Sequence, residues 1–129
     1  MTTDTLTNTV SVLVSAKPQG VTFNPAGSRI AFQLPAHDHW EIAAINADGS
    51  GWTSLTRADP LSFTVVNNVA PTWSPDGKQV LFLSDRNGKW EFFVVNADGS
   101  DLKQVLKNVS DTLSIRYNFS NERVIDWAK

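Results

Sequence analysis

Cysteine is absent from this chain of 129 residues, which excludes disulfides, thiolate metal sites and cysteine nucleophiles. Lys and Arg form no cluster and the net charge is −2, so the electrostatic footprint of a nucleic-acid-binding protein is missing. No apolar run approaches the roughly 18 residues that a membrane-spanning helix needs. The only apolar patch near the start is 10–14, and no basic residue precedes Lys17, so we expect no signal peptide and no membrane insertion. These absences predict a soluble chain and leave its compartment open.

A repeat dominates what is present. Residues 21–50 and 71–100 align without a gap at a displacement of 50, with 11 identities in 30 positions. The shared residues include Trp40 with Trp90, Glu41 with Glu91, and the run Asn-Ala-Asp-Gly-Ser that closes both copies. A period of this size is typical of propellers, solenoids and arrays.

Each copy reads as short strands between tight turns, with no helical periodicity. The turn signals are Asn-Pro-Ala-Gly, Ser-Pro-Asp-Gly, Asp-Arg-Asn-Gly and Asn-Ala-Asp-Gly, and we expect the last to form a type I′ hairpin turn. Asp76 and Asp85 are expected to cap their own turns. The predicted strands are 21–23, 29–34, 40–45, 52–56, 71–73, 79–83, 90–95 and 102–106, with 61–66 as an irregular extra strand. Four antiparallel strands in each unit predict an all-β fold built from β-propeller blades.

The ends of the chain look like the two parts of one more blade. We assign blades to 20–57 and 70–107, an outer strand to 1–16, and two inner strands to 113–129. Because a ring of fewer than about four blades does not close, we expect copies to associate head to tail as a homo-oligomer, a six-bladed dimer or a larger ring. The alternative is a fragment whose other blades lie elsewhere in the native gene product.

The runs SPDGK, FLSDRNGKWEFFVVNADGS and the weaker NPAGS resemble the repeat of TolB-like propellers, a bacterial variant of the WD-type repeat. That repeat builds the Pal-binding propeller of the Tol system, gating propellers of some serine peptidases, and many sensor or scaffold proteins. The resemblance therefore implies a non-catalytic module that binds a protein or a small ligand, in a family that is often periplasmic or extracytoplasmic.

Binding residues usually collect on the loops at one end of a rigid scaffold. Those loops are predicted at 35–39, 57–70, 85–89 and 107–114, and the candidate binding residues are Trp52, Arg57, Asp59 and Arg86. Trp52 has no aromatic counterpart in the second copy, so it is expected to be the most exposed tryptophan. Trp40, Trp73, Trp90 and Trp127 recur at equivalent places and are expected in the core or between blades.

The competing hypothesis is a metal-dependent site or an enzyme on the loop His37-Asp38-His39. Two histidines at i and i+2 project to the same side of an extended segment, and Asp38 lies between them. Such a set could bind a divalent metal, with ligands shared between subunits, although a solvated loop explains the same residues. No Gly-x-Ser-x-Gly elbow or recognisable triad is present, so we assign no catalytic residue and no other cofactor.

Overall fold

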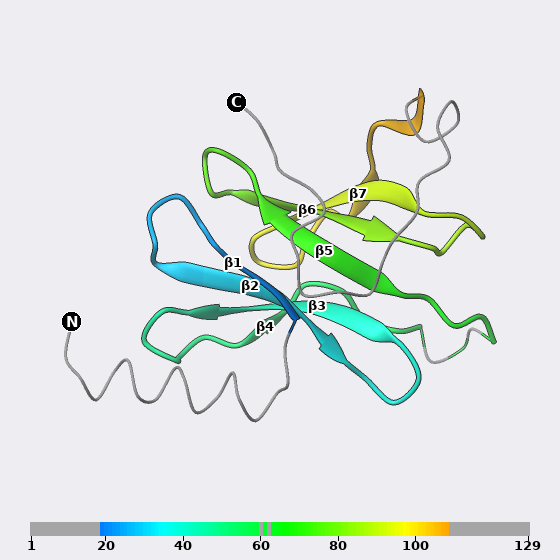
Figure 1. The fold of residues 1–129 in the computed structure, drawn as a ribbon, viewed down its shortest axis with the longest axis horizontal. Helices are drawn as coiled ribbons and strands as arrows, with labels where there is room; N and C mark the ends of the chain where they lie inside the picture. Colours follow the sequence, from blue (N-terminus) through cyan, green and yellow to red (C-terminus); the bar gives the residue numbers. More distant parts are fainter. Residues whose placement is uncertain (1–18, 60, 62, 109–129) are drawn as a thin grey trace.

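The computed structural model describes residues 19–59, 61 and 63–108, which form two four-stranded antiparallel sheets in the orders β1-β2-β3-β4 and β5-β6-β7-β8. We call the sheets blade 1 and blade 2; they stack on one another (Figure 1). The all-β fold of four-stranded blades is confirmed. The strands are β1 (Gln19–Phe23), β2 (Arg29–Pro35), β3 (Trp40–Asn46), β4 (Thr53–Ser54), β5 (Asn68–Trp73), β6 (Gln79–Ser84), β7 (Glu91–Asn96) and β8 (Lys103–Gln104).

The turns form where glycine was expected to permit them, but their type differs. In the β3–β4 turn the amide of Gly49 donates to the carbonyl of Asn46 at 2.9 Å, and Gly49 has a φ of 87°. A type I′ turn needs positive φ at both central residues, and neither Ala47 nor Asp48 has it. The type I′ prediction is therefore wrong: this is a type I turn followed by a left-handed glycine, held by a bond from the Ser50 amide to Asp48 Oδ1 at 2.9 Å.

The first strand of each blade, β1 in blade 1 and β5 in blade 2, is longer than the sequence predicts, and each contains a bulge. The register shifts between Gln19 and Thr22 in β1, and between Val69 and Thr72 in β5. The bulged residues are Gly20, with a φ of 59°, and Ala70, with a φ of 57°. In β5 the pairing continues beyond the bulge, with Asn68 opposite Ser84 and Val69 opposite Leu83, so the strand begins at Asn68 rather than at residue 71.

The last strand of each blade, β4 in blade 1 and β8 in blade 2, is shorter than the sequence predicts. Each is reduced to two residues, Thr53–Ser54 in β4 and Lys103–Gln104 in β8. The amides of Leu55 and Thr56 both donate to the carbonyl of Ile42, which ends the regular ladder. Asp101 and Leu106 have positive φ and bound β8. The extra strand predicted at 61–66 is also wrong, since none of its described residues lies in a strand.

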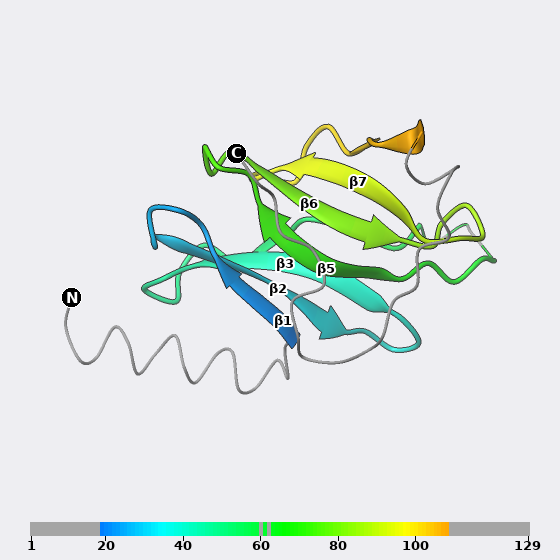
Figure 2. The same ribbon diagram turned by 45° about the horizontal axis from the view of Figure 1, so that its top comes forward.

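The main core lies between the two blades. Ala31, Ile42, Ala44 and Leu55 of blade 1 pack against Trp73, Val80, Phe82, Phe93 and Val95 of blade 2. Figure 2 shows β5 lying between the rest of blade 2 and β2–β3. The Trp73 indole donates to the carbonyl of Thr22 at 3.1 Å, while Trp40 and Trp90 pack partly buried beside Val69, Ala70 and Leu83. Inter-blade or core packing is thus confirmed for these three tryptophans.

The assignments to 1–16 and 113–129, including Trp127, lie outside the described residues. Within the described residues, no helix has the length and apolar character needed to cross a membrane.

Candidate functional site

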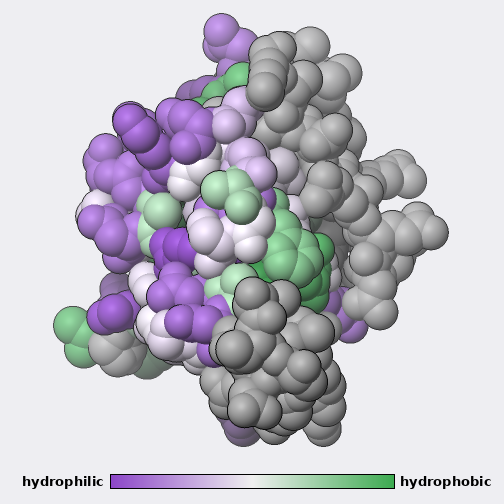
Figure 3. All heavy atoms as spheres, turned by 90° about the vertical axis from the view of Figure 1, so that its left-hand side faces the viewer, coloured by the Kyte–Doolittle hydropathy of each residue, from purple (hydrophilic) through white to green (hydrophobic). Residues whose placement is uncertain are grey.

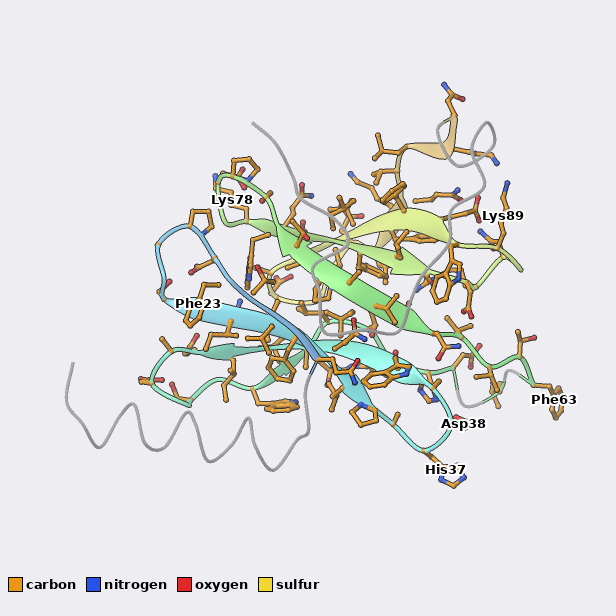
Figure 4. The ribbon with its side chains drawn as sticks, viewed as in Figure 1. Phe23, His37, Asp38, Phe63, Lys78 and Lys89 are labelled. Atoms are coloured by element: carbon orange, nitrogen blue, oxygen red, sulfur yellow. The ribbon has the colours of Figure 1, made fainter. Side chains whose placement is uncertain are left out.

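The loops after β2, β4 and β6 lie at one end of the blades. Figure 4 places His37, Asp38, Phe63 and Lys89 at this end and Phe23 and Lys78 at the other. We call residues 35–39, 57–67 and 85–89 the loop end. Figure 3 shows the opposite end, where hydrophilic side chains cover most of the described surface. Three of the four predicted loops therefore gather at one end, and most of the fourth, 107–114, lies outside the described residues.

The loop end contains a cavity of about 320 Å³, which we call the loop-end cavity. Its lining includes five residues singled out in the sequence: Asp38, His39, Arg57, Asp59 and Arg86. Three separate loops contribute them. The sequence therefore predicted most of the polar residues around this cavity.

His39 lies between two carboxylates. Its Nδ1 is 2.6 Å from Asp38 Oδ1 and its Nε2 is 3.4 Å from Glu41 Oε2. The hydrogen bond to Asp38, helped by the charge of Glu41, raises the pKa of His39 above its ordinary value, although burial opposes the shift. The same bond lowers the pKa of Asp38. His39 is thus held as a cation at mildly acidic pH.

His37 does not join this group. Residues 37–39 form successive bends, so the extended backbone assumed for the metal hypothesis is not formed. The His37 side chain points away from the blades (Figure 4). Among the residues that the structure describes, no group of three or more His, Asp or Glu side chains could hold a metal ion. A divalent metal bound to this loop stays a prediction, and the described side chains of a single chain do not form a set of ligands that supports it.

Glu41 was missed as a site residue and connects the two blades. Its Oε1 accepts hydrogen bonds from Thr56 Oγ1 and from Asn68 Nδ2, both at 2.8 Å. The repeat matches Glu41 with Glu91, but the two carboxylates have different partners. Glu91 instead receives bonds from Asn87 and Gln104 within its own blade. In the sequence, only the polar residue Asn68, just before the predicted strand 71–73, could have indicated that Glu41 bonds to the other blade.

Arg86 is a half-buried cation on the wall of the cavity. Its Nη2 donates to Asn68 Oδ1 at 2.8 Å and its Nε donates to Ser84 Oγ at 3.0 Å. The guanidinium lies 4.5 Å from the centroid of the Phe93 ring, within the range of a cation–π contact. Burial lowers the pKa of Arg86, and the charges of Glu41 and Asp85 oppose that shift.

The carboxylates of Asp76 and Asp85 accept hydrogen bonds from different parts of the chain. Asp76 caps its own turn as predicted, accepting from Ser74 Oγ at 2.6 Å and from the Lys78 amide at 3.0 Å. Asp85 instead accepts from the amide and the side chain of Asn67, at 2.7 and 3.0 Å. The prediction for Asp85 is therefore wrong, because this carboxylate fixes the segment that crosses between the blades.

Arg57 is the cation without a partner at this end. Its side chain is exposed, and it makes no hydrogen bond or ion pair with any residue that the structure describes. The neighbouring carboxylates are engaged: Asp38 with His39, Glu41 with Asn68 and Thr56, and Asp59 with the amide of Leu61 at 2.9 Å. The lining carries three carboxylates against two guanidiniums and His39, so the cavity as a whole has no excess of positive charge, and Arg57 is the cation in it that no described residue pairs.

A second hollow of about 290 Å³ lies beside the cavity, on blade 1, and Glu41, Arg57 and Ala58 line both. We call it the blade 1 groove. Its walls include Leu34, Ala43 and Trp52. Trp52 is 43% exposed and contacts Phe32 edge-on, with ring centroids 5.3 Å apart. The predicted exposure of Trp52 is confirmed, but its place is this groove rather than the loop-end cavity.

No family model matches the chain, and no curated protein matches it. Solved structures do match. A protein assigned as TolB from Agrobacterium tumefaciens shares 25% identity over 64% of this chain, with a TM-score of 0.56. TolB from Acinetobacter baumannii shares 21% identity over 67% of the chain, with a TM-score of 0.51. Blades 1 and 2 are TolB-like propeller blades.

The TolB-like fold also occurs in a puromycin-hydrolysing peptidase of Mycobacterium tuberculosis, at 17% identity over 67% of this chain and a TM-score of 0.56. These matches span 28%, 20% and 14% of the three longer chains respectively. The likeness therefore concerns a part of each relative, and identity as low as that to the peptidase shows the fold alone.

Proposed function

We propose that this TolB-like chain is a non-catalytic protein-interaction module whose loop end binds an acidic segment of another polypeptide. The observation that carries the proposal is Arg57, an exposed guanidinium that lines both hollows of the loop end and has no partner among the described residues. A guanidinium pairs well with a carboxylate because its planar fork of donors matches the two oxygens.

The rest of the cavity suits a binding site. The Glu41–Asn68–Arg86 network fixes the walls on both blades, so the site is largely formed before a partner arrives. Phe63 and Val65 add apolar surface to the lining. A rigid polar wall with adjacent apolar side chains favours binding of an extended segment that carries both kinds of side chain.

The arrangement of His39 supports a non-catalytic role. A general base needs a ring nitrogen directed at the group that it deprotonates. Both ring nitrogens of His39 face carboxylates, those of Asp38 and Glu41. This histidine therefore has no hydroxyl partner to activate among the residues that the structure describes.

The test uses a displayed library of random peptides selected on the purified chain. We expect the enriched peptides to contain Asp or Glu, and Arg57→Gln to weaken their binding at least about tenfold, the loss of roughly 1.4 kcal/mol. Lys78→Gln, at the opposite end, is the matched control and should leave the affinity unchanged.

Two outcomes would overturn the proposal. One is enrichment of peptides without acidic residues, or of peptides that bind Arg57→Gln as tightly as the wild type. The other is cleavage of the bound peptides, detected by mass spectrometry, that stops when His39 is changed to Gln.

A further inference from the structure

The blade 1 groove lies where the two blades differ at two equivalent positions. In blade 2, Phe93 pairs with Phe82 across the sheet and their rings stack at 6.0 Å, with Arg86 over Phe93. In blade 1 the residue paired with Phe32 is Ala43. Ala36 stands 50 positions before Arg86, and both alanines line the groove. The groove thus occupies the place that a phenyl ring and a guanidinium fill in blade 2.

The groove has the size and walls of a site for an aromatic ring. A dry apolar cavity of roughly 150 Å³ is large enough to hold benzene, and the blade 1 groove measures about 290 Å³. Leu34 and Trp52 provide apolar walls. The exposed part of the Trp52 ring can make the edge-to-face contacts that aromatic pairs prefer.

The same end of the molecule presents an aromatic ring that nothing covers. Leu61, Phe63 and Val65, which we call the apolar tip, are 86%, 104% and 49% exposed. Phe63 projects away from the blades (Figure 4). Three large apolar side chains at alternate positions of one exposed segment are a feature of interaction sites rather than of the surface of a monomer.

We propose that the partner at this end is a second copy of the chain, with Phe63 of each copy inserted into the blade 1 groove of the other. Tip and groove lie at the same end, so a two-fold axis satisfies both contacts at once. Charge agrees, because Asp59 is exposed and only its Oδ1 accepts the neutral amide of Leu61, so its negative charge can face Arg57 of the other copy reciprocally across the axis. The inference rests on the loop end being an interaction surface, as proposed above.

Sedimentation velocity over a range of protein concentrations tests the pairing. The wild type should show a monomer–dimer equilibrium, and Phe63→Ser should weaken dimerisation at least about tenfold. Ala43→Phe, which restores the blade 2 residue and fills the groove, should do the same. Phe23→Ser removes a ring of 58% exposure at the opposite end and should leave the dimer unchanged.

A charge reversal gives a test that does not depend on filling the groove. Arg57→Glu should weaken the dimer, and adding Asp59→Lys to the same chain should restore part of the loss. A wild type that is monomeric at every concentration would overturn the pairing, as would a dimer that survives both Phe63→Ser and Ala43→Phe. Because Ala43 does not line the loop-end cavity, peptide binding that depends on Arg57 but tolerates Ala43→Phe would leave the proposed function standing alone.

Discussion

Gly88 and Gly99 have nearly the same backbone conformation in different surroundings. Their φ values are 88° and 89°. A Cβ added to Gly88 would meet no atom within 4 Å, whereas one on Gly99 would lie 3.0 Å from the backbone oxygen of Ser54. Gly99 therefore lets the turn after β7 lie closely against blade 1, and a side chain there would require a small shift of the Ser54 backbone.

We expect Gly99→Ala to lower the free energy of unfolding more than Gly88→Ala. Both variants carry the left-handed backbone cost of about 1–2 kcal/mol, but only Gly99→Ala adds the contact with a backbone atom that cannot turn aside. Urea denaturation of the two variants measures the difference. Equal losses in the free energy of unfolding would mean that the blades can move apart slightly at Gly99 without a cost in free energy.

At the scale of the element, the β2–β3 loop is held by a titratable pair. The pKa of His39 is raised in the folded chain, chiefly by its bond to Asp38. A raised pKa stabilises the fold fully below the unfolded value of about 6.5 and loses that contribution as pH rises through the folded pKa.

The stability lost in His39→Gln should accordingly be largest below pH 6.5 and should shrink at higher pH, above the folded pKa. Thermal unfolding of the wild type and the variant from pH 5 to 9 measures this. Asp38→Asn removes the main cause of the shift, so in that background the pH dependence should flatten. An effect of His39→Gln that grows toward alkaline pH would contradict the assignment.

The strands themselves were predictable because local chemistry determines them. Alternating apolar residues between Pro- and Gly-containing turns located the central parts of β2, β3, β6 and β7 within one or two residues. The bulge at Ala70 was not predictable, because it depends on the Gln33 side chain of the other blade, whose Oε1 accepts the Ala70 amide at 2.8 Å. No window of local sequence contains that partner.

The candidate site was also predictable from the sequence only in part. The repeat predicted which loops meet at one end, and so brought Asp38, His39, Arg57, Asp59 and Arg86 to one cavity. It could not predict that Glu41 bonds across to Asn68, or that His37 turns away, because those contacts depend on how the blades stack. The alignment of the two copies places Ala43 at the position of Phe93. Only the packing of the blades shows that this difference in size coincides with the blade 1 groove.

For the whole molecule, the important property is that the largest cluster of buried apolar residues is shared by both blades. β5 belongs to blade 2 and packs on β1, β2 and β3, and the cluster around Phe82 includes residues of both sheets. Stacked repeats depend on such neighbour contacts for most of their stability. The blades should therefore unfold together rather than one at a time.

Phe82→Leu tests this coupling. Phe82 is fully buried, so the smaller side chain should lower the free energy of unfolding by about 1–2 kcal/mol. Hydrogen exchange should show the same loss of protection in β2 of blade 1 as in β7 of blade 2, because the opening that exposes one exposes the other. Loss of protection confined to β6 and β7, with β2 unchanged, would show that blade 1 stays folded when blade 2 opens, and that the shared core is a contact between independent units.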